Sequence, residues 1–161
     1  MDTEARTDLR RLIDDHRQAA LATLADGAPA LSMVLYAVER NPERSPAFLI
    51  HVSKLAAHTG QLMADPRAAL LIAAPDIGAV DPQTLARVSI QATAQPIARD
   101  GPDFAAARGA YLDRLPQQAY LFDFPDFVLF RLEPLNARYV GGFARAFSLD
   151  AARLAAILAR P

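Results

Sequence analysis

Four polar side chains that can contact an anion directly follow one apolar run of the sequence. The run "AFLIHV" covers residues 47–52, and Ser53, Lys54, His58 and Thr59 come after it. If Ser53 caps a helix that begins there, the unpaired N–H groups and the positive end of the helix dipole favour a negative charge. The hydroxyl and ammonium groups, with two more donors one turn later, suit a phosphate. The structural alternative is a capping serine, a solvated lysine and a half-buried, hydrogen-bonded histidine.

Two other stretches hold side chains that could touch a ligand. In "SMVLY", residues 32–36, strand alternation would place Ser32, Val34 and Tyr36 on one face. The backbone amides and the Ser32 hydroxyl of such a strand could line a flat ligand, or the strand could simply be half-buried. Arg87 opens a later strand after a loop, where it either reaches a ligand or stays solvated.

Composition excludes several classes of chemistry. The chain has no cysteine, which rules out disulfides, thiolate zinc sites and a thiol nucleophile. With three histidines and no cysteine we expect no metal site, and neither a P-loop nor a Gly-x-Ser-x-Gly motif is present. A formal net charge of −1 with scattered arginines predicts no nucleic-acid binding. The lack of a long apolar run and the charged N-terminus predict a cytoplasmic protein with no membrane segment.

The elements that must position these side chains suit a single domain over residues 1–161. Asp26-Gly27 lies between two β-like runs and predicts a hairpin turn. Short turns connect most of the strands, which favours an antiparallel barrel with a few covering helices over a doubly wound parallel sheet. Beyond the hairpin, the pattern predicts helices over residues 3–18, 54–64, 102–115 and 150–160, and strands over 47–52, 67–74, 86–97, 126–134 and 136–147.

Four passages together resemble the pyridoxamine 5′-phosphate oxidase-like FMN-binding split-barrel family, in its haem-utilisation-related branch. They are "AALATL" with "SMVLYAV", "SKLAAHTGQLMADPRAALLI", "RVSIQATAQPI" and "FRLEPLNARYVGGFARAFSL", in the family's order. The resemblance implies a mainly β fold, a split antiparallel β-barrel of six or more strands with peripheral helices. It also implies a homodimer that holds FMN in grooves between its subunits.

The resemblance further implies a set of FMN contacts. The phosphate would lie against the residues after the third strand, the isoalloxazine ring would run along the second strand, and a basic side chain would come from the start of the fifth. The implied contacts are Ser53, His58 and Thr59, with His51 and Val52 beside them, then Ser32, Met33 and Val34, and finally Arg87. Ala57-His58 stands where the pyridoxamine oxidases carry an Arg-Lys pair, and a neutral histidine holds a phosphate less strongly than a fixed cation.

The function implied by the resemblance is that of an FMN-dependent oxidoreductase acting on a small-molecule substrate that the sequence does not identify. A non-enzymatic flavin or haem binder, or a cofactor-free split barrel that serves as an interaction module, are the alternatives. The haem-degrading relatives ligate iron through a histidine near the C-terminus, whereas no histidine follows His58 here. We therefore expect no haem ligation of that kind.

Overall fold

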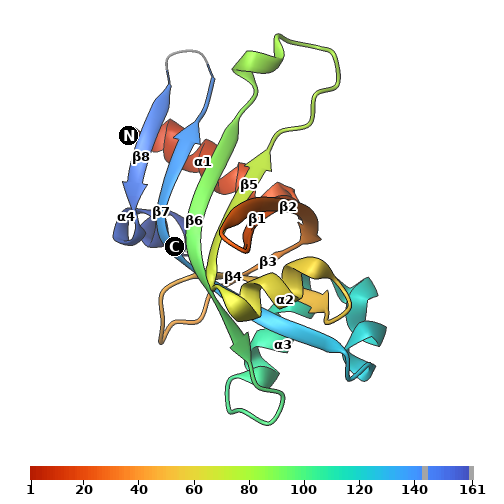
Figure 1. The fold of residues 1–161 in the computed structure, drawn as a ribbon. Coiled ribbons are helices and arrows are strands. Elements are labelled where there is room, and N and C mark those ends of the chain that lie inside the picture. The colour runs from red at the N-terminus through yellow and green to blue at the C-terminus, as the bar shows by residue number, and fades with distance from the viewer. Residues whose placement is uncertain (143–144, 160–161) are drawn as a thin grey trace.

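The computed structural model of the chain describes residues 1–142 and 145–159. Its eight strands form one curled antiparallel sheet with helices around it (Figure 1). The strands are β1 (Gln18–Ala25), β2 (Ala28–Leu35), β3 (Ala37–Glu39), β4 (Ala47–Ser53), β5 (Arg67–Ala73), β6 (Arg87–Ile97), β7 (Phe127–Val140) and β8 (Ala146–Asp150). The helices are α1 (Thr3–Asp15), α2 (Ala57–Ala64), α3 (Phe104–Arg114) and α4 (Ala151–Leu158), with 3-10 helices η1 (Pro82–Thr84) and η2 (Pro116–Asp123). Among the described residues, no helix is long and apolar enough to span a membrane.

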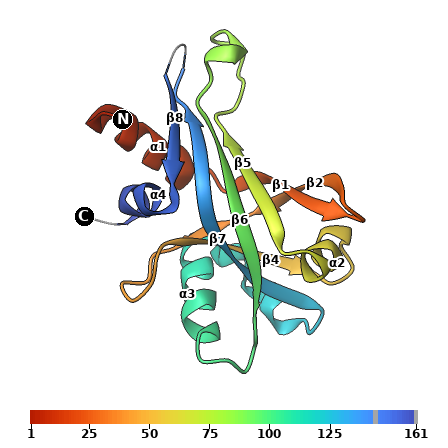
Figure 2. The same cartoon turned by 60° about the vertical axis from the view of Figure 1, so that its left-hand side comes forward.

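The sheet forms an open barrel, which confirms the expected split-barrel fold. Its strand order is β2-β1-β5-β6-β7-β4-β3, with β8 paired to β7 off this path, so β2 and β3 are the two ends of the path. The long strand β7 joins the halves, because residues 127–132 pair with β4 and residues 136–140 pair with β8. Strand β6 pairs along the other side of β7. Figure 2 shows α1 and α4 on one side of the sheet and α2 on the other.

Local sequence signals explain where several elements begin and end. The hairpin between β1 and β2 turns at Asp26 and Gly27, which have φ values of 51° and 81°. Positive φ at both central residues is the geometry of a type I′ turn, so the predicted hairpin is confirmed. Helix α1 is capped by the Asp2 side chain, but it stops at Asp15 instead of residue 18. It stops there because Gln18 already pairs with β2 as the first residue of β1.

The prediction of two strands over residues 126–134 and 136–147 is wrong, because β7 runs without a break from Phe127 to Val140. Pro134 lacks an N–H group and was expected to end the first strand. In the structure Pro134 pairs with Ala92, and Leu135 has no partner because the register shifts between Gln91 and Ala92. This β-bulge lets one strand contain the proline and still continue.

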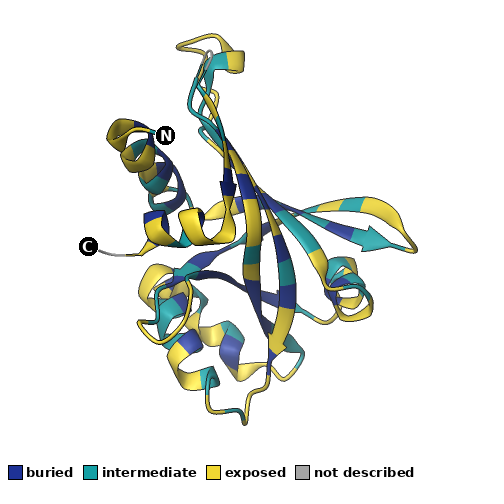
Figure 3. Cartoon of the chain, turned by 90° about the vertical axis from the view of Figure 1, so that its left-hand side faces the viewer, coloured by how far each residue is buried: buried dark blue, intermediate teal, exposed yellow. Residues whose placement is uncertain are grey.

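Two apolar cores hold the fold together, and β4 contributes to both. Side chains alternate along a strand, so Phe48 and Ile50 enter the barrel core while Leu49 faces the opposite way. The second core lies between this face of the sheet and α3 with η2, and it contains Tyr111 and Phe122. Buried and exposed positions also alternate along the longer strands (Figure 3). The end of β4 is therefore anchored on both faces, immediately before the predicted site.

Candidate cofactor site

The loop after β4 does not begin a helix at Ser53. Helix α2 begins at Ala57, and its N-cap is Ala56, which makes no side-chain capping hydrogen bond. The intervening residues form a tight turn, in which the Ala56 amide donates to the Ser53 carbonyl (3.1 Å) and the Leu55 amide donates to Ser53 Oγ (3.1 Å). The prediction that Ser53 caps the helix is wrong, because this extra turn separates Ser53 from the first helical residue.

Most donors of the predicted phosphate cradle are engaged with the protein itself. Ser53 Oγ donates to a carboxylate oxygen of Asp126 (3.3 Å), and Lys54 Nζ donates to the Pro125 carbonyl (3.2 Å). Thr59 is buried, and its hydroxyl donates to the Ser53 carbonyl (2.6 Å). These bonds fix the turn, and they place a negative charge beside Ser53 where an anion would have to bind.

Two backbone donors remain at the start of α2. The amides of Ala57 and His58 lie in the first helical turn, and neither has an acceptor among residues 1–142 and 145–159. The imidazole of His58 is half-buried, and burial lowers its pKa below the usual value. A neutral His58 adds no charge to this helix end. The site can therefore offer an anion two free amides and the exposed Lys54 ammonium, which also donates to the Pro125 carbonyl.

The side chains of His51 and Val52 point to opposite sides of β4. Val52 enters the barrel core, whereas His51 stacks on Phe122 with 3.8 Å between ring centroids and lies near Tyr111 and Phe127. His51 is only 8% exposed, and its Nδ1 has no hydrogen-bond partner in the described part of the chain. Burial, helped by nearby arginines, lowers the pKa of His51 to about 4. Its imidazole is therefore neutral and covered by η2.

The three residues of β2 that were predicted to contact FMN lie on two different faces of the strand. Ser32 and Val34 point inward with Tyr36, as expected, while Met33 is 63% exposed and Leu31 is 76% exposed on the other face. Met33 pairs with Ala20, which pairs with Leu71 of β5, so one row of apolar side chains crosses three strands. We call this surface the outer apolar face; it consists of Ala20, Ala22, Leu31, Met33, Ala69 and Leu71.

Beside β1 and β2, α2 presents a second uncharged surface. The ten residues from Leu55 to Ala64 include no charged side chain, although Leu55 is 90% exposed and Met63 is also exposed. Gln61 accepts a hydrogen bond from Thr23 of β1 (2.6 Å), which holds the helix against the sheet. Sequence reasoning missed both surfaces. The uncharged run was visible in the sequence, but the exposure of Leu55 was not.

Arg87 is not brought together with the loop after β4. Its guanidinium donates to the carbonyls of Gln83 (3.2 Å) and Leu85 (3.0 Å), so the side chain folds back on the loop before β6. Arg87 pairs with Ala73, at the end of β5 that lies farthest from α2. Within one chain, Ser53, His58 and Thr59 are clustered, Met33 lies on the neighbouring edge strand, and Arg87 is separate.

Known proteins similar to this chain include several that are named for haem. The chloroplastic heme oxygenase HOZ of Arabidopsis thaliana is 38% identical over 122 residues, which cover 76% of this chain and 35% of HOZ. A heme binding protein from Mycobacterium smegmatis is 32% identical with a TM-score of 0.82, over 97% of this chain and 62% of that protein. HutZ from Vibrio cholerae, a heme storage protein, is 22% identical with a TM-score of 0.69, over 80% of this chain and 88% of HutZ, and shows the fold alone.

This chain thus spans about a third of the curated relative and less than two thirds of the mycobacterial structure. The family described as pyridoxamine 5′-phosphate oxidase matches residues 5–141, most of the chain. That match includes every strand of the sheet except β8, together with the loop after β4 and α2. The chain therefore belongs to the pyridoxamine 5′-phosphate oxidase family.

Proposed function

We propose that this chain binds haem and forms a homodimer through the outer apolar face. The observation that carries the proposal is the exposed apolar surface of β2, β1 and β5, together with the uncharged segment 55–64, which packs against the other face of β1 through Gln61 and Thr23. Contiguous exposed apolar surface on a folded domain marks a site of interaction. A planar macrocycle and a second copy of the chain would both remove this surface from water.

The energetic gain from covering this surface is substantial. Burying one exposed Leu or Met side chain stabilises a complex by about 1.5–3 kcal/mol. Leu31 and Met33 lie on β2 and Leu71 lies on β5, with only β1 between the two strands, so one flat partner can cover all three at once. A haem ring is apolar over both faces and carries its carboxylates at one edge, so it requires no phosphate cradle.

The loop after β4 supports haem over a phosphate-anchored flavin. Ser53 and Thr59 donate their hydroxyl hydrogens within the protein, and the Asp126 carboxylate beside Ser53 repels a phosphate. Two of the relatives that share more than 30% identity with this chain are named as a heme oxygenase and a heme binding protein. Those names describe the relatives, and they make haem the first ligand to titrate into this protein.

The three histidines differ in their suitability as an iron ligand. His51 is buried beneath Phe122, and His16 Nδ1 lies 2.7 Å from the Leu12 carbonyl. His58 is half-buried at the start of α2, and its ring makes no hydrogen bond to any described residue. An imidazole with a free ring nitrogen is a common haem ligand. We assign the ligand role to His58.

FMN is the second candidate, favoured by the free amides of Ala57 and His58 at the start of α2. Helix N-termini bind phosphate groups through such amides. The edge strand β2 would then flank the ring, and Arg87 would have to come from the partner subunit, because it lies apart from this loop within one chain. Bound FMN would supply redox chemistry, and the protein would be a flavin-dependent oxidoreductase whose residues position the cofactor.

One pair of titrations separates the two candidates. Haem added to the purified protein should give a Soret band shifted from that of free haem and saturating at one haem per chain or per dimer. FMN should show little fluorescence quenching at the same concentrations. Quenching of FMN fluorescence without a haem-dependent spectral change would show that FMN is the ligand instead of haem. If the protein responds to neither compound, the remaining function is that of a cofactor-free interaction module.

Variants test the surface and the ligand separately. Leu31→Glu with Met33→Glu should convert the dimer to a monomer in sedimentation velocity and weaken haem binding. Ile77→Glu, an equally exposed apolar position on the loop after β5, is the matched control and should change neither. His58→Ala should shift the Soret band while haem still binds, and added imidazole should restore the original spectrum. A dimer that survives the double substitution contradicts the proposed interface.

A further inference from the structure

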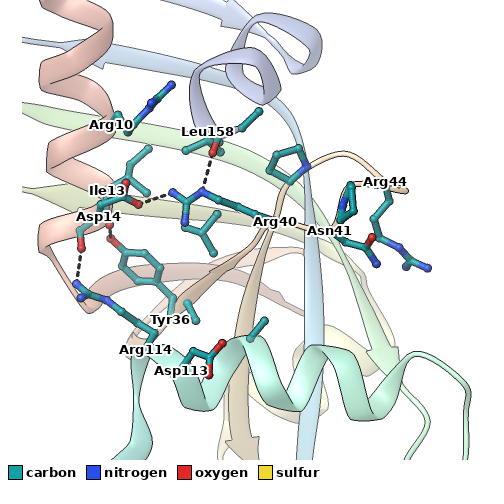
Figure 4. A pocket seen from close by; sticks show the side chains of 16 residues that line it. Arg10, Ile13, Asp14, Tyr36, Arg40, Asn41, Arg44, Asp113, Arg114 and Leu158 are labelled. Carbon is teal, nitrogen blue, oxygen red and sulfur yellow. Dashed lines mark hydrogen bonds and ion pairs between the residues drawn. The ribbon is translucent and has the colours of Figure 1, made fainter. Parts of the chain in front are cut away.

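A cavity of about 810 Å³ lies between α1, α3, the end of α4 and the loop after β3 (Figure 4). It shares no residue with the outer apolar face or with segment 55–64. In Figures 2 and 3, α1 and α4 lie on one side of the sheet and α2 lies on the other. The volume falls in the range of small-molecule sites. The proposed haem surface therefore does not account for this cavity.

Positively charged side chains dominate the cavity wall. Arg10 comes from α1, Arg40 and Arg44 from the loop after β3, and Arg114 from the end of α3. The carboxylates in the same lining are those of Asp14 and Asp113. Four arginines from three separate segments thus line one space together with two aspartates.

Three of the arginines are fixed by backbone carbonyls at the ends of helices. The last carbonyls of a helix have no partner within the helix, and arginines commonly bind them. The hydrogen bonds join Arg10 Nε to the Ile157 oxygen (2.7 Å), Arg40 Nε to the Leu158 oxygen (2.6 Å), and Arg114 to the oxygens of Asp14 and His16 (3.2 Å for His16). Holding these guanidiniums in place lowers the entropy that a ligand would lose on binding them.

Two of the four arginines have no carboxylate partner within the part of the chain that the structure describes. Arg40 and Arg44 each form an ion pair with an aspartate, whereas Arg10 and Arg114 pair with no carboxylate among the described residues. A carbonyl satisfies one N–H group but does not cancel the charge of a guanidinium. Both terminal nitrogens of Arg10 and one of Arg114 also make no hydrogen bond within the described chain. These nitrogens are available to a carboxylate or a phosphate.

Most of the rest of the wall is apolar, with contributions from Ile13, Ala37, Val38, Ala110 and Leu158. A ligand that matches both parts has an apolar body and a negative group. We infer that this cavity binds a small organic anion, with its carboxylate or phosphate at Arg10 or Arg114 and its body against the apolar wall. The inference does not depend on haem or FMN binding.

Calorimetric titration of the full chain at low salt tests the inference with three probes of one shape. Phenyl phosphate and benzoate carry the two anionic groups, and phenol is the neutral control. At least one anion should bind, more weakly as salt is added, and phenol should not. The stronger of the two anions identifies the preferred group. Absence of binding by both would overturn the inference.

Four variants locate the binding. Arg10→Gln and Arg114→Gln, made singly and together, should weaken the preferred anion, by at least about tenfold in the double variant, because each removes a charge-assisted hydrogen bond. Arg67→Gln, an exposed arginine paired with Asp65 outside the cavity, should leave binding unchanged.

Asp113→Asn keeps the test decisive if loss of the arginine caps destabilises the fold. Asp113 is exposed on α3 and forms no ion pair with any described residue, so its neutralisation should not disturb folding. Removing this negative charge should tighten anion binding by roughly threefold, the scale of a screened pair interaction. Unchanged or weaker binding in Asp113→Asn, or an equal loss in Arg67→Gln, would overturn the inference.

Discussion

The α2 side of the molecule carries a run of ten residues without a charge, several of them exposed, whereas the cavity between α1, α3 and α4 is lined by four arginines. On the α2 side, polar donors are consumed within the chain and apolar side chains are left in water. On the cavity side, hydrogen bonds to helix ends hold charged groups in place without neutralising all of them. The first region would bind a partner that buries its exposed apolar surface. The second would bind a ligand that carries a negative charge.

The largest effect should come from the ion pair that supports the cavity wall at β3. Arg131 and Glu39 are both buried and form a bidentate pair with distances of 2.6 and 2.9 Å. Glu39→Ala leaves a buried guanidinium without its main partner and should lower the free energy of unfolding by about 3–5 kcal/mol, measured in urea. Glu133→Ala, an exposed glutamate on β7, is the control, and an equal loss there would contradict this explanation.

Acid should destabilise the protein through His51, the buried histidine between the two regions. Its folded pKa of about 4 lies below the ordinary value of 6.5, so the unfolded chain binds more protons between these values. Stability is therefore full above pH 6.5 and falls as the pH drops toward 4, by about 3 kcal/mol. His51→Phe should remove this slope in urea titrations at several pH values. A slope as steep as in the wild type would show that other groups cause it.

Adding charge to the α2 side should make that side resemble the cavity. Ala57→Arg with His58→Lys restores the cations that the resemblance places at these positions, beside two free amides. FMN affinity should rise by about tenfold, the scale of one charge-assisted hydrogen bond, as measured by fluorescence quenching. Ala64→Arg, at the other end of the same helix, should have no effect. If FMN affinity rises equally in Ala64→Arg, the effect is only a general attraction between FMN and added positive charge.

The smallest effect concerns how α4 is held beside the cavity. The Asp150 side chain accepts a hydrogen bond from the Arg153 amide (2.8 Å) at the start of this helix. Asp150→Ala should cost about 1 kcal/mol of unfolding free energy, while Asp150→Asn should cost only a few tenths. Thermal unfolding followed by circular dichroism separates the two variants. Equal stability of both would show that the cap contributes little here.

Prediction from the sequence succeeded where a local signal suffices. The turn at Asp26-Gly27 and a helix that begins at about residue 150 were confirmed, because turn geometry and helix starts depend on a few adjacent residues. It failed at Pro134, where the bulge depends on the partner strand β6, and at Ser53, where the chain makes an extra turn before α2. The assignment of cofactor contacts, including Arg87, remains a prediction.

The sequence alone determined the order of most strands and helices and the family, because apolar periodicity, turn residues and four ordered passages are local properties of the chain. Only the tertiary structure decided which side chains face one another. It showed that Ser53 and Thr59 donate their hydroxyl hydrogens within the protein, and that Leu31 and Met33 face water. It also brought together arginines separated by more than a hundred residues, since contacts between distant segments depend on how the sheet curls and where the helices pack.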